Sequence, residues 1–176
     1  MEFRILGPVE VWEGGRSLHL GGAKQRALLA ILLTQANQVV ATDRLIELVW
    51  PGEPPETAGH SLQVYVSGLR KALEPTHSAG TPHTVLVSQA PGYLIRVGDE
   101  DLDASRFQQL VEEGRQAMSE RASDLATTKF REALGLWRGV PLADSASQPF
   151  YTGGCCFGLS CLLALDAVQH SRRVEP

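Results

Sequence analysis

The sequence predicts an α+β protein made of two parts. The first is a winged helix-turn-helix domain with an N-terminal antiparallel β-sheet and a C-terminal hairpin wing. The second is an all-α, TPR-like partial helical domain. The first part is predicted by the order of the patterns, which is short alternating strands, then three short amphipathic helices, then a β-hairpin. Two longer amphipathic helices after residue 100 predict the second part.

The N-terminal segment, residues 3–20, alternates apolar and polar side chains as strands of a small antiparallel sheet do. Gly14 and Gly15 supply a two-residue turn within it. Residues 23–37 then place apolar side chains at helical spacing, with Lys24 and Arg26 in the first turn and Asn37 as the expected C-cap.

A second helix is expected after Thr42, which is a favourable N-cap residue, and it ends at Trp50. Pro51, Pro54 and Pro55 follow it. Because proline cannot continue a helix and restricts the residue before it, this segment is expected to be a stiff loop.

The third helix, from Glu56 to about Glu74, has two unlike faces. Its apolar face predicts burial and consists of Ala58, Leu62, Tyr65, Val66, Leu69 and Leu73. Its opposite face consists mainly of short, uncharged residues: Thr57, His60, Gln63, Val64, Ser67, Gly68 and Lys71. Small polar groups can read base edges, Val64 can contact thymine methyl groups, and Lys71 with Arg70 can bind phosphate. Such a face also suits a helix that packs against a neighbouring domain, so the pattern alone leaves both interpretations open.

The wing is expected between Val85 and Val97, as two strands around a Pro91–Gly92 turn. After an acidic linker, residues 104–119 and 122–137 are expected to form an antiparallel helix pair. The apolar stripes of the pair are Phe107, Leu110, Val111 and Met118, and Leu125, Phe130, Ala133, Leu134 and Trp137. We therefore place the winged domain at residues 1–97 and the partial helical domain at residues 98–150.

Residues 151–176 form an atypical tail rich in Cys, Gly and Leu. The chain has no charged residue between Asp144 and Asp166, and the amphipathic period is lost there. Our hypothesis is that an altered reading frame or a truncated gene produced this tail. Resequencing that finds one continuous frame, supported by the intact mass of the protein, would refute it.

Composition limits the classes of function. The net charge is −4 at pH 7, and residues 1–96 hold as many acidic as basic side chains, so any DNA binding must rest on local placement of charge. No secretory signal pattern opens the chain, and a cytoplasmic location is expected. The apolar run at residues 154–167 is shorter than the roughly 20 residues of a membrane span.

Enzymatic and metal-binding patterns are weak. The GGAK segment at residues 21–24 lacks the remainder of a phosphate-binding loop. Cys155, Cys156 and Cys161 lack the CxxC spacing of a zinc site. The histidines, including His77 and His83, fall in separate elements with no nucleophile pattern beside them, and most are expected at the surface. We expect no enzymatic activity, no cofactor and no metal.

The stretch RALLAILLTQANQVVATDRLIELVWPGEPPETAGHSLQVYVSGLRKALEP, followed by PGYLIRV, resembles the DNA-binding domain of the Streptomyces antibiotic regulatory protein (SARP) family, the AfsR/DnrI/RedD-type activators. That domain is similar to the OmpR/PhoB-like winged helix, a phosphorelay-like output domain. The stretch from LDASRFQQLVEEGR to EALGLWRGVPLAD resembles the bacterial transcriptional activation domain that follows it. The resemblance covers roughly residues 1–150.

This resemblance implies an activator of antibiotic biosynthesis genes. It would bind direct repeats in double-stranded promoter DNA overlapping the −35 region, in tandem or as a homodimer, and would recruit RNA polymerase holoenzyme. The implied recognition helix is Glu56 to Leu73, and the implied wing is Val85 to Val97. Base contacts are expected from Thr57, His60, Gln63, Val64 and Ser67. Phosphate contacts are expected from Lys24, Arg26, Arg44, Arg70, Lys71 and Tyr93. The loop with Trp50, Gly52 and Glu53 is expected to face polymerase.

Two departures from the family pattern affect these expectations. Many family members have a larger residue at the position of Gly68, so direct DNA contact is not expected there. Family members also continue with charged helices where this chain has its atypical tail. The alternative function is therefore a protein-interaction module, or a competitor of full-length regulators that has lost activation.

Overall fold

The computed structural model describes residues 1–78, 80–140 and 142. Its N-terminal sheet consists of β1 (Glu2–Arg4), β2 (Glu10–Glu13) and β3 (Arg16–Ser17), paired antiparallel in that order. Gly14 and Gly15 connect β2 to β3 with φ values of 55° and 78°. Because side chains disfavour these positive φ angles, glycine suits both turn positions. The predicted N-terminal antiparallel sheet is confirmed.

Three helices and a second sheet follow and form the winged helix-turn-helix. The helices are α1 (Ala23–Thr34), α2 (Thr42–Val49) and α3 (Ala58–Leu73), and they pack against one another. The strands of the wing sheet are β4 (Val40–Ala41), β5 (Leu86–Gln89) and β6 (Gly92–Ile95). Their order is β4-β6-β5, with antiparallel pairing, so the short strand before α2 fastens the wing to the helices.

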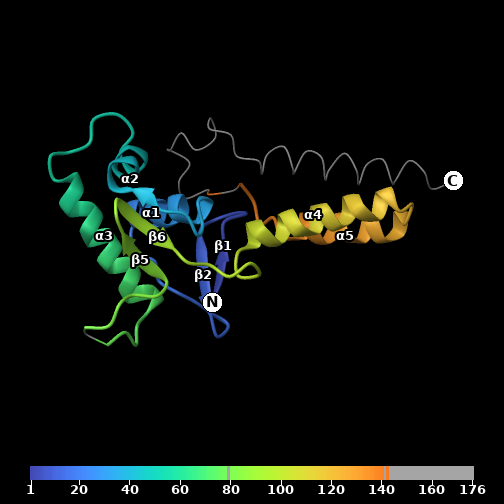
Figure 1. Cartoon of the computed structure of the whole chain (residues 1–176), viewed down its shortest axis with the longest axis horizontal. Coiled ribbons are helices and arrows are strands. Elements are labelled where there is room, and N and C mark those ends of the chain that lie inside the picture. The colour runs from blue at the N-terminus through green and yellow to red at the C-terminus, as the bar shows by residue number, and fades with distance from the viewer. Residues whose placement is uncertain (79, 141, 143–176) are drawn as a thin grey trace.

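Helices α4 (Asp103–Ser119) and α5 (Ser123–Gly135) lie side by side and project away from the winged domain, on the side opposite α3 (Figure 1). Two predicted stripe residues are exposed, Met118 at 51% and Leu125 at 50%, while Leu134 and Trp137 are half-buried. Met118 and Leu125 lie next to the turn that joins the helices, where the described residues supply no third helix to cover them. Gly114 of α4 is buried, and the Phe130 ring of α5 packs so close to it that an added Cβ would lie 2.6 Å from that ring.

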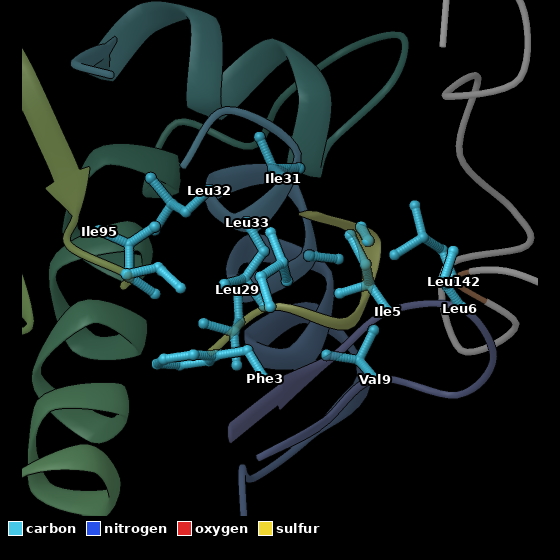
Figure 2. Close-up of a cluster of buried hydrophobic side chains, with 14 of the residues drawn as sticks. Phe3, Ile5, Leu6, Val9, Leu29, Ile31, Leu32, Leu33, Ile95 and Leu142 are labelled. Carbon is cyan, nitrogen blue, oxygen red and sulfur yellow. The ribbon is translucent and has the colours of Figure 1, made fainter. Parts of the chain in front are cut away.

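One hydrophobic cluster joins the two parts of the chain. It contains Phe3 and Leu29 of the winged domain and Phe107 of α4. Figure 2 shows the portion of this cluster in which the N-terminal segment and α1 meet. The backbone N–H of Phe3 also donates to the carbonyl of Asp101 at 2.6 Å. The N-terminal sheet therefore lies between the winged domain's helices and the α4–α5 pair (Figure 1).

Two predicted helix caps are wrong. Helix α1 is capped at Gln35, whereas the Asn37 side chain exchanges two hydrogen bonds with the backbone of Val97, at 2.9 and 3.0 Å. Thr42 is the first residue of α2 rather than its N-cap, and its hydroxyl donates to the carbonyl of Pro91. In both cases the polar side chain forms hydrogen bonds with a residue distant in sequence instead of with the end of its own helix.

The expectations for residues 143–176, including the atypical tail and its cysteines, lie outside the described residues. Within the described part of the chain, none of the helices combines the length and the apolar character needed to cross a membrane.

Candidate nucleic-acid interface

Helix α3 is held to the domain by its apolar face. Of the six residues predicted on that face, Tyr65 is half-buried and the other five are buried. Tyr65 stacks on Trp50, with ring centroids 5.9 Å apart and an interplanar angle of 20°. Because Trp50 ends α2, this ring pair fixes the start of the α2–α3 loop against α3.

The opposite face of α3 is open to solvent. The structure places all five residues predicted to contact bases at exposed positions of this face or at its N-cap: Thr57, His60, Gln63, Val64 and Ser67. Val64 is 52% exposed, so its apolar side chain is accessible on this face. Figure 1 shows α3 at the end of the molecule remote from α4 and α5, so this helix pair does not cover the face.

Gly68 does not belong to the exposed face, and its assignment there is wrong. A Cβ at this position would come within 2.7 Å of the amide nitrogen of Gln25, near the start of α1. Gly68 is half-buried because the N-terminal turn of α1 passes against α3 at this point. The absence of a side chain at Gly68 therefore permits a close approach between α3 and α1.

A groove separates the C-terminal half of α3 from the wing. Its lining includes Gln63, Ser67 and Lys71 from α3 and Tyr93 from β6. Arg70 fastens the two elements, because its Nε donates to the Leu86 carbonyl at 2.9 Å and its Nη2 donates to the Ser88 hydroxyl at 2.8 Å. The groove thus brings together three of the predicted phosphate-binding residues, Arg70, Lys71 and Tyr93.

The wing turn is formed by Ala90 and Pro91 rather than by Pro91 and Gly92. Gly92 is the first residue of β6 and lies directly against β4. A Cβ at Gly92 would overlap the carbonyl oxygen of Val40. The absence of a side chain at Gly92 therefore allows β4 and β6 to pair. The glycine in this segment reflects that contact between strands and not a turn position.

The remaining predicted phosphate contacts have partners inside the protein. The ammonium of Lys24 donates to the carbonyl of Val49 at 2.6 Å, at the C-terminal end of α2. Arg26 donates to the carbonyl of Gly21 at 2.8 Å. Arg44 is exposed and pairs with Glu47 at 2.9 Å. An exposed pair of this kind contributes little to stability, so Arg44 can exchange its partner at low cost.

The α2–α3 loop is exposed from Pro51 to Thr57, and it includes Gly52 and Glu53 of the predicted polymerase-facing loop. Trp50, the third predicted residue of that loop, is half-buried and lies 5.6 Å from the Lys24 ammonium. Trp50 therefore packs against Tyr65 and Lys24 at the start of the loop.

Sequence reasoning missed one group of side chains. Glu74, His77 and His83 come together at the end of the groove, whereas the two histidines were expected in separate elements. The two histidines stand six residues apart in the connection between α3 and β5, and that spacing matches no established motif.

A winged helix-turn-helix with an exposed helix face, joined to an α-helical domain, defines a class of transcriptional regulator. Family models agree: "Transcriptional regulatory protein, C terminal" matches residues 15–95, and "Bacterial transcriptional activator domain" matches residues 102–157. The chain belongs to the family of SARP-type transcriptional regulators. Its family resemblance and fold class are thereby confirmed.

Individual relatives agree with this assignment. Transcriptional regulatory protein MoaR1 of Mycobacterium tuberculosis is 38% identical over 152 residues, which are 85% of this chain and 48% of that protein. Regulatory protein DnrI of Streptomyces peucetius is 35% identical over 148 residues, or 82% of this chain and 54% of the relative. The chain thus spans about half the length of these relatives. Their names are those of regulators, not of enzymes.

A solved structure of Mycobacterium tuberculosis EmbR, in complex with a low-affinity phosphopeptide, superposes with a TM-score of 0.87 at 33% identity. The match covers 97% of this chain and 45% of that chain.

Proposed function

We propose that the chain is a sequence-specific DNA-binding transcriptional regulator that activates a gene cluster for a secondary metabolite such as an antibiotic. It would bind direct repeats near the −35 region and contact RNA polymerase holoenzyme through the α2–α3 loop. The observation that carries this proposal is the exposed face of α3, with Gln63 and Ser67 beside the apolar Val64 and a cation, Lys71, at its C-terminal end. The membership of the family and the names of its relatives support it.

In this proposal α3 enters the major groove. Gln63 can bond adenine in a bidentate manner, and Val64 can contact a thymine methyl group. Lys71 would bind a phosphate, and Tyr93 of the wing would reach the backbone beside the minor groove. The domain itself carries no net charge, so adjacent binding of two copies on a direct repeat would supply affinity that one copy lacks.

The test is a mobility-shift assay on tandem-repeat promoter DNA, repeated across a salt series. Lys71→Ala should weaken binding to all sequences about equally and lower the slope of log K against log salt by about 1. Gln63→Ala should cost about 1–3 kcal/mol and relax the preference at one base pair without changing that slope. Arg131→Ala is the control, because Arg131 is an exposed cation on α5, in the helix pair that projects away from α3.

Binding that ignores both salt and Lys71→Ala would contradict the proposed phosphate contact. The protein-interaction alternative makes a different prediction. In that case the protein would capture polymerase or a full-length relative while no promoter fragment shifts at any salt concentration.

A further inference from the structure

The groove beside α3 ends in a group of side chains that DNA reading does not use. Glu74 follows the last residue of α3, and His77 and His83 lie in the connection to β5. All three side chains are half-buried, and one donor atom from each lies within 4.8 Å of the others. The same residues line the groove together with Lys71 and Tyr93.

The two imidazole rings are already arranged side by side. Their centroids are 3.9 Å apart and their planes differ by 18°. The Nδ1 of His83 lies 2.8 Å from the Oε2 of Glu74, while the Nε2 of His77 has only a long contact of 3.4 Å to the Thr81 hydroxyl. One carboxylate oxygen and two imidazoles therefore converge from three positions of the chain.

The carboxylate is held in place from its other side. The backbone N–H and the hydroxyl of Thr84 both donate to the Oε1 of Glu74, at 2.9 and 2.7 Å. Burial alone would raise the pKa of Glu74, but hydrogen bonds from Thr84 and His83 lower it to about 2. The hydrogen bonds from Thr84 thus leave the second oxygen, Oε2, on the side of His83.

We propose that Glu74, His77 and His83 bind a zinc ion at the end of the recognition groove. Two imidazole nitrogens and one carboxylate oxygen form a ligand set that suits Zn²⁺, whereas Mg²⁺ and Ca²⁺ prefer oxygen ligands throughout. Zinc–ligand bonds of about 2.0–2.2 Å at tetrahedral angles place the donor atoms roughly 3.4 Å apart. His83 Nδ1 and Glu74 Oε2, now 2.8 Å apart, would therefore exchange their hydrogen bond for the metal and separate slightly. Any pair of donors as far apart as 4.8 Å would close by on the order of 1 Å, which rotation of half-buried side chains permits. The fourth position would be open to the groove and would hold water.

The ion would change the local charge and order. The ionised Glu74 carries −1, and a divalent cation would bring the cluster to +1 beside Lys71. It would also tie the connection between α3 and β5 to the end of α3. The site is independent of DNA, so it can stand even if the proposed function fails.

The experiment uses the full chain in which Cys155, Cys156 and Cys161 are replaced by serine, so that no thiolate competes. Zn²⁺ is titrated against a chromophoric chelator, and Co²⁺ is added separately to record the visible bands of a four-coordinate ion. We expect one equivalent of Zn²⁺ to bind, the visible bands of tetrahedral cobalt, and a higher Tm with zinc than without.

His77→Ala and His83→Ala should each weaken zinc binding at least about tenfold, because even the loss of a residue that merely orients a ligand costs 10–100-fold. His19→Ala is the matched control and should leave it unchanged, since His19 is an exposed histidine that precedes α1. The circular dichroism of each metal-free variant confirms that it folds. Failure to bind stoichiometric zinc, or binding that survives both His77→Ala and His83→Ala, would overturn the proposal.

Discussion

Asp103 should be one of the most sensitive positions for stability, because it joins both parts of the chain. It is the first residue of α4 and only 7% exposed. Its carboxylate accepts the backbone N–H of Ile5 at 2.8 Å and that of Leu6 at 3.0 Å. Arg138, which follows α5, approaches the same carboxylate at 3.5 Å. Asp103 therefore links the segment after β1, the start of α4 and the end of the helix pair.

The expected cost of Asp103→Ala follows from the groups that it leaves behind. Ile5 and Leu6 are 2% and 1% exposed, so their N–H groups would lose an acceptor in a site that water reaches poorly. An unsatisfied buried donor costs about 1–3 kcal/mol, which gives about 2–6 kcal/mol for two. Removal of a buried carboxylate recovers part of this cost, so we expect the lower half of that range. Arg138 keeps its ion pair with Glu10 at 3.1 Å.

Urea denaturation measures the change in the free energy of unfolding, and amide hydrogen exchange reports on Ile5 and Leu6 directly. Asp103→Ala should lower the free energy of unfolding and remove the protection of these two amides. Asp99→Ala is the control, because Asp99 is an exposed carboxylate in the linker just before α4, and it should change stability by less than about 0.5 kcal/mol. The reasoning fails if Asp103→Ala costs no more than Asp99→Ala while both amides stay protected.

Three further predictions concern pH, the wing strands and the wing contact. Burial raises the pKa of Asp103 above its ordinary value of 3.8, so the folded state binds more protons than the unfolded state between the two values. The contribution of Asp103 to stability should therefore fall as pH rises through that window, and urea denaturation at stepped pH should show this slope in the wild type but not in Asp103→Asn. Gly92→Ala should destabilise the protein by at least about 2 kcal/mol, because the added methyl group overlaps the backbone of Val40. Gly59→Ala in α3, where the space around the glycine is open, should stabilise the protein by up to about 1 kcal/mol. Equal shifts of Tm in the two variants would contradict the packing argument. Arg70→Ala removes two hydrogen bonds to the wing and should speed hydrogen exchange in β5 while leaving the exchange of α4 unchanged, so uniform acceleration across the chain would indicate global rather than local loosening.

Much of α3 could be predicted from the sequence. The helical period separates Leu62, Val66 and Leu69 from His60 and Gln63, and the structure buries the first group and exposes the second. A period reports which side of one helix is apolar, and an apolar side must be covered in any fold. The period does not report which partner, if any, binds the polar side. DNA contact by the exposed side of α3 therefore stays a prediction.

Local patterns in the sequence predict three features, because each depends on neighbouring residues in the chain. These are the order of strands and helices, the two-residue turn at Gly14–Gly15 and the two faces of α3. The close approach at Gly68, the bonds of Asn37 to Val97 and the meeting of His77 with His83 were decided only in the tertiary structure. Each of these depends on where a separate element or loop passes, and the sequence period of one element carries no record of that path. The candidate groove combines both kinds of information: its helix was predictable, and its far end was not.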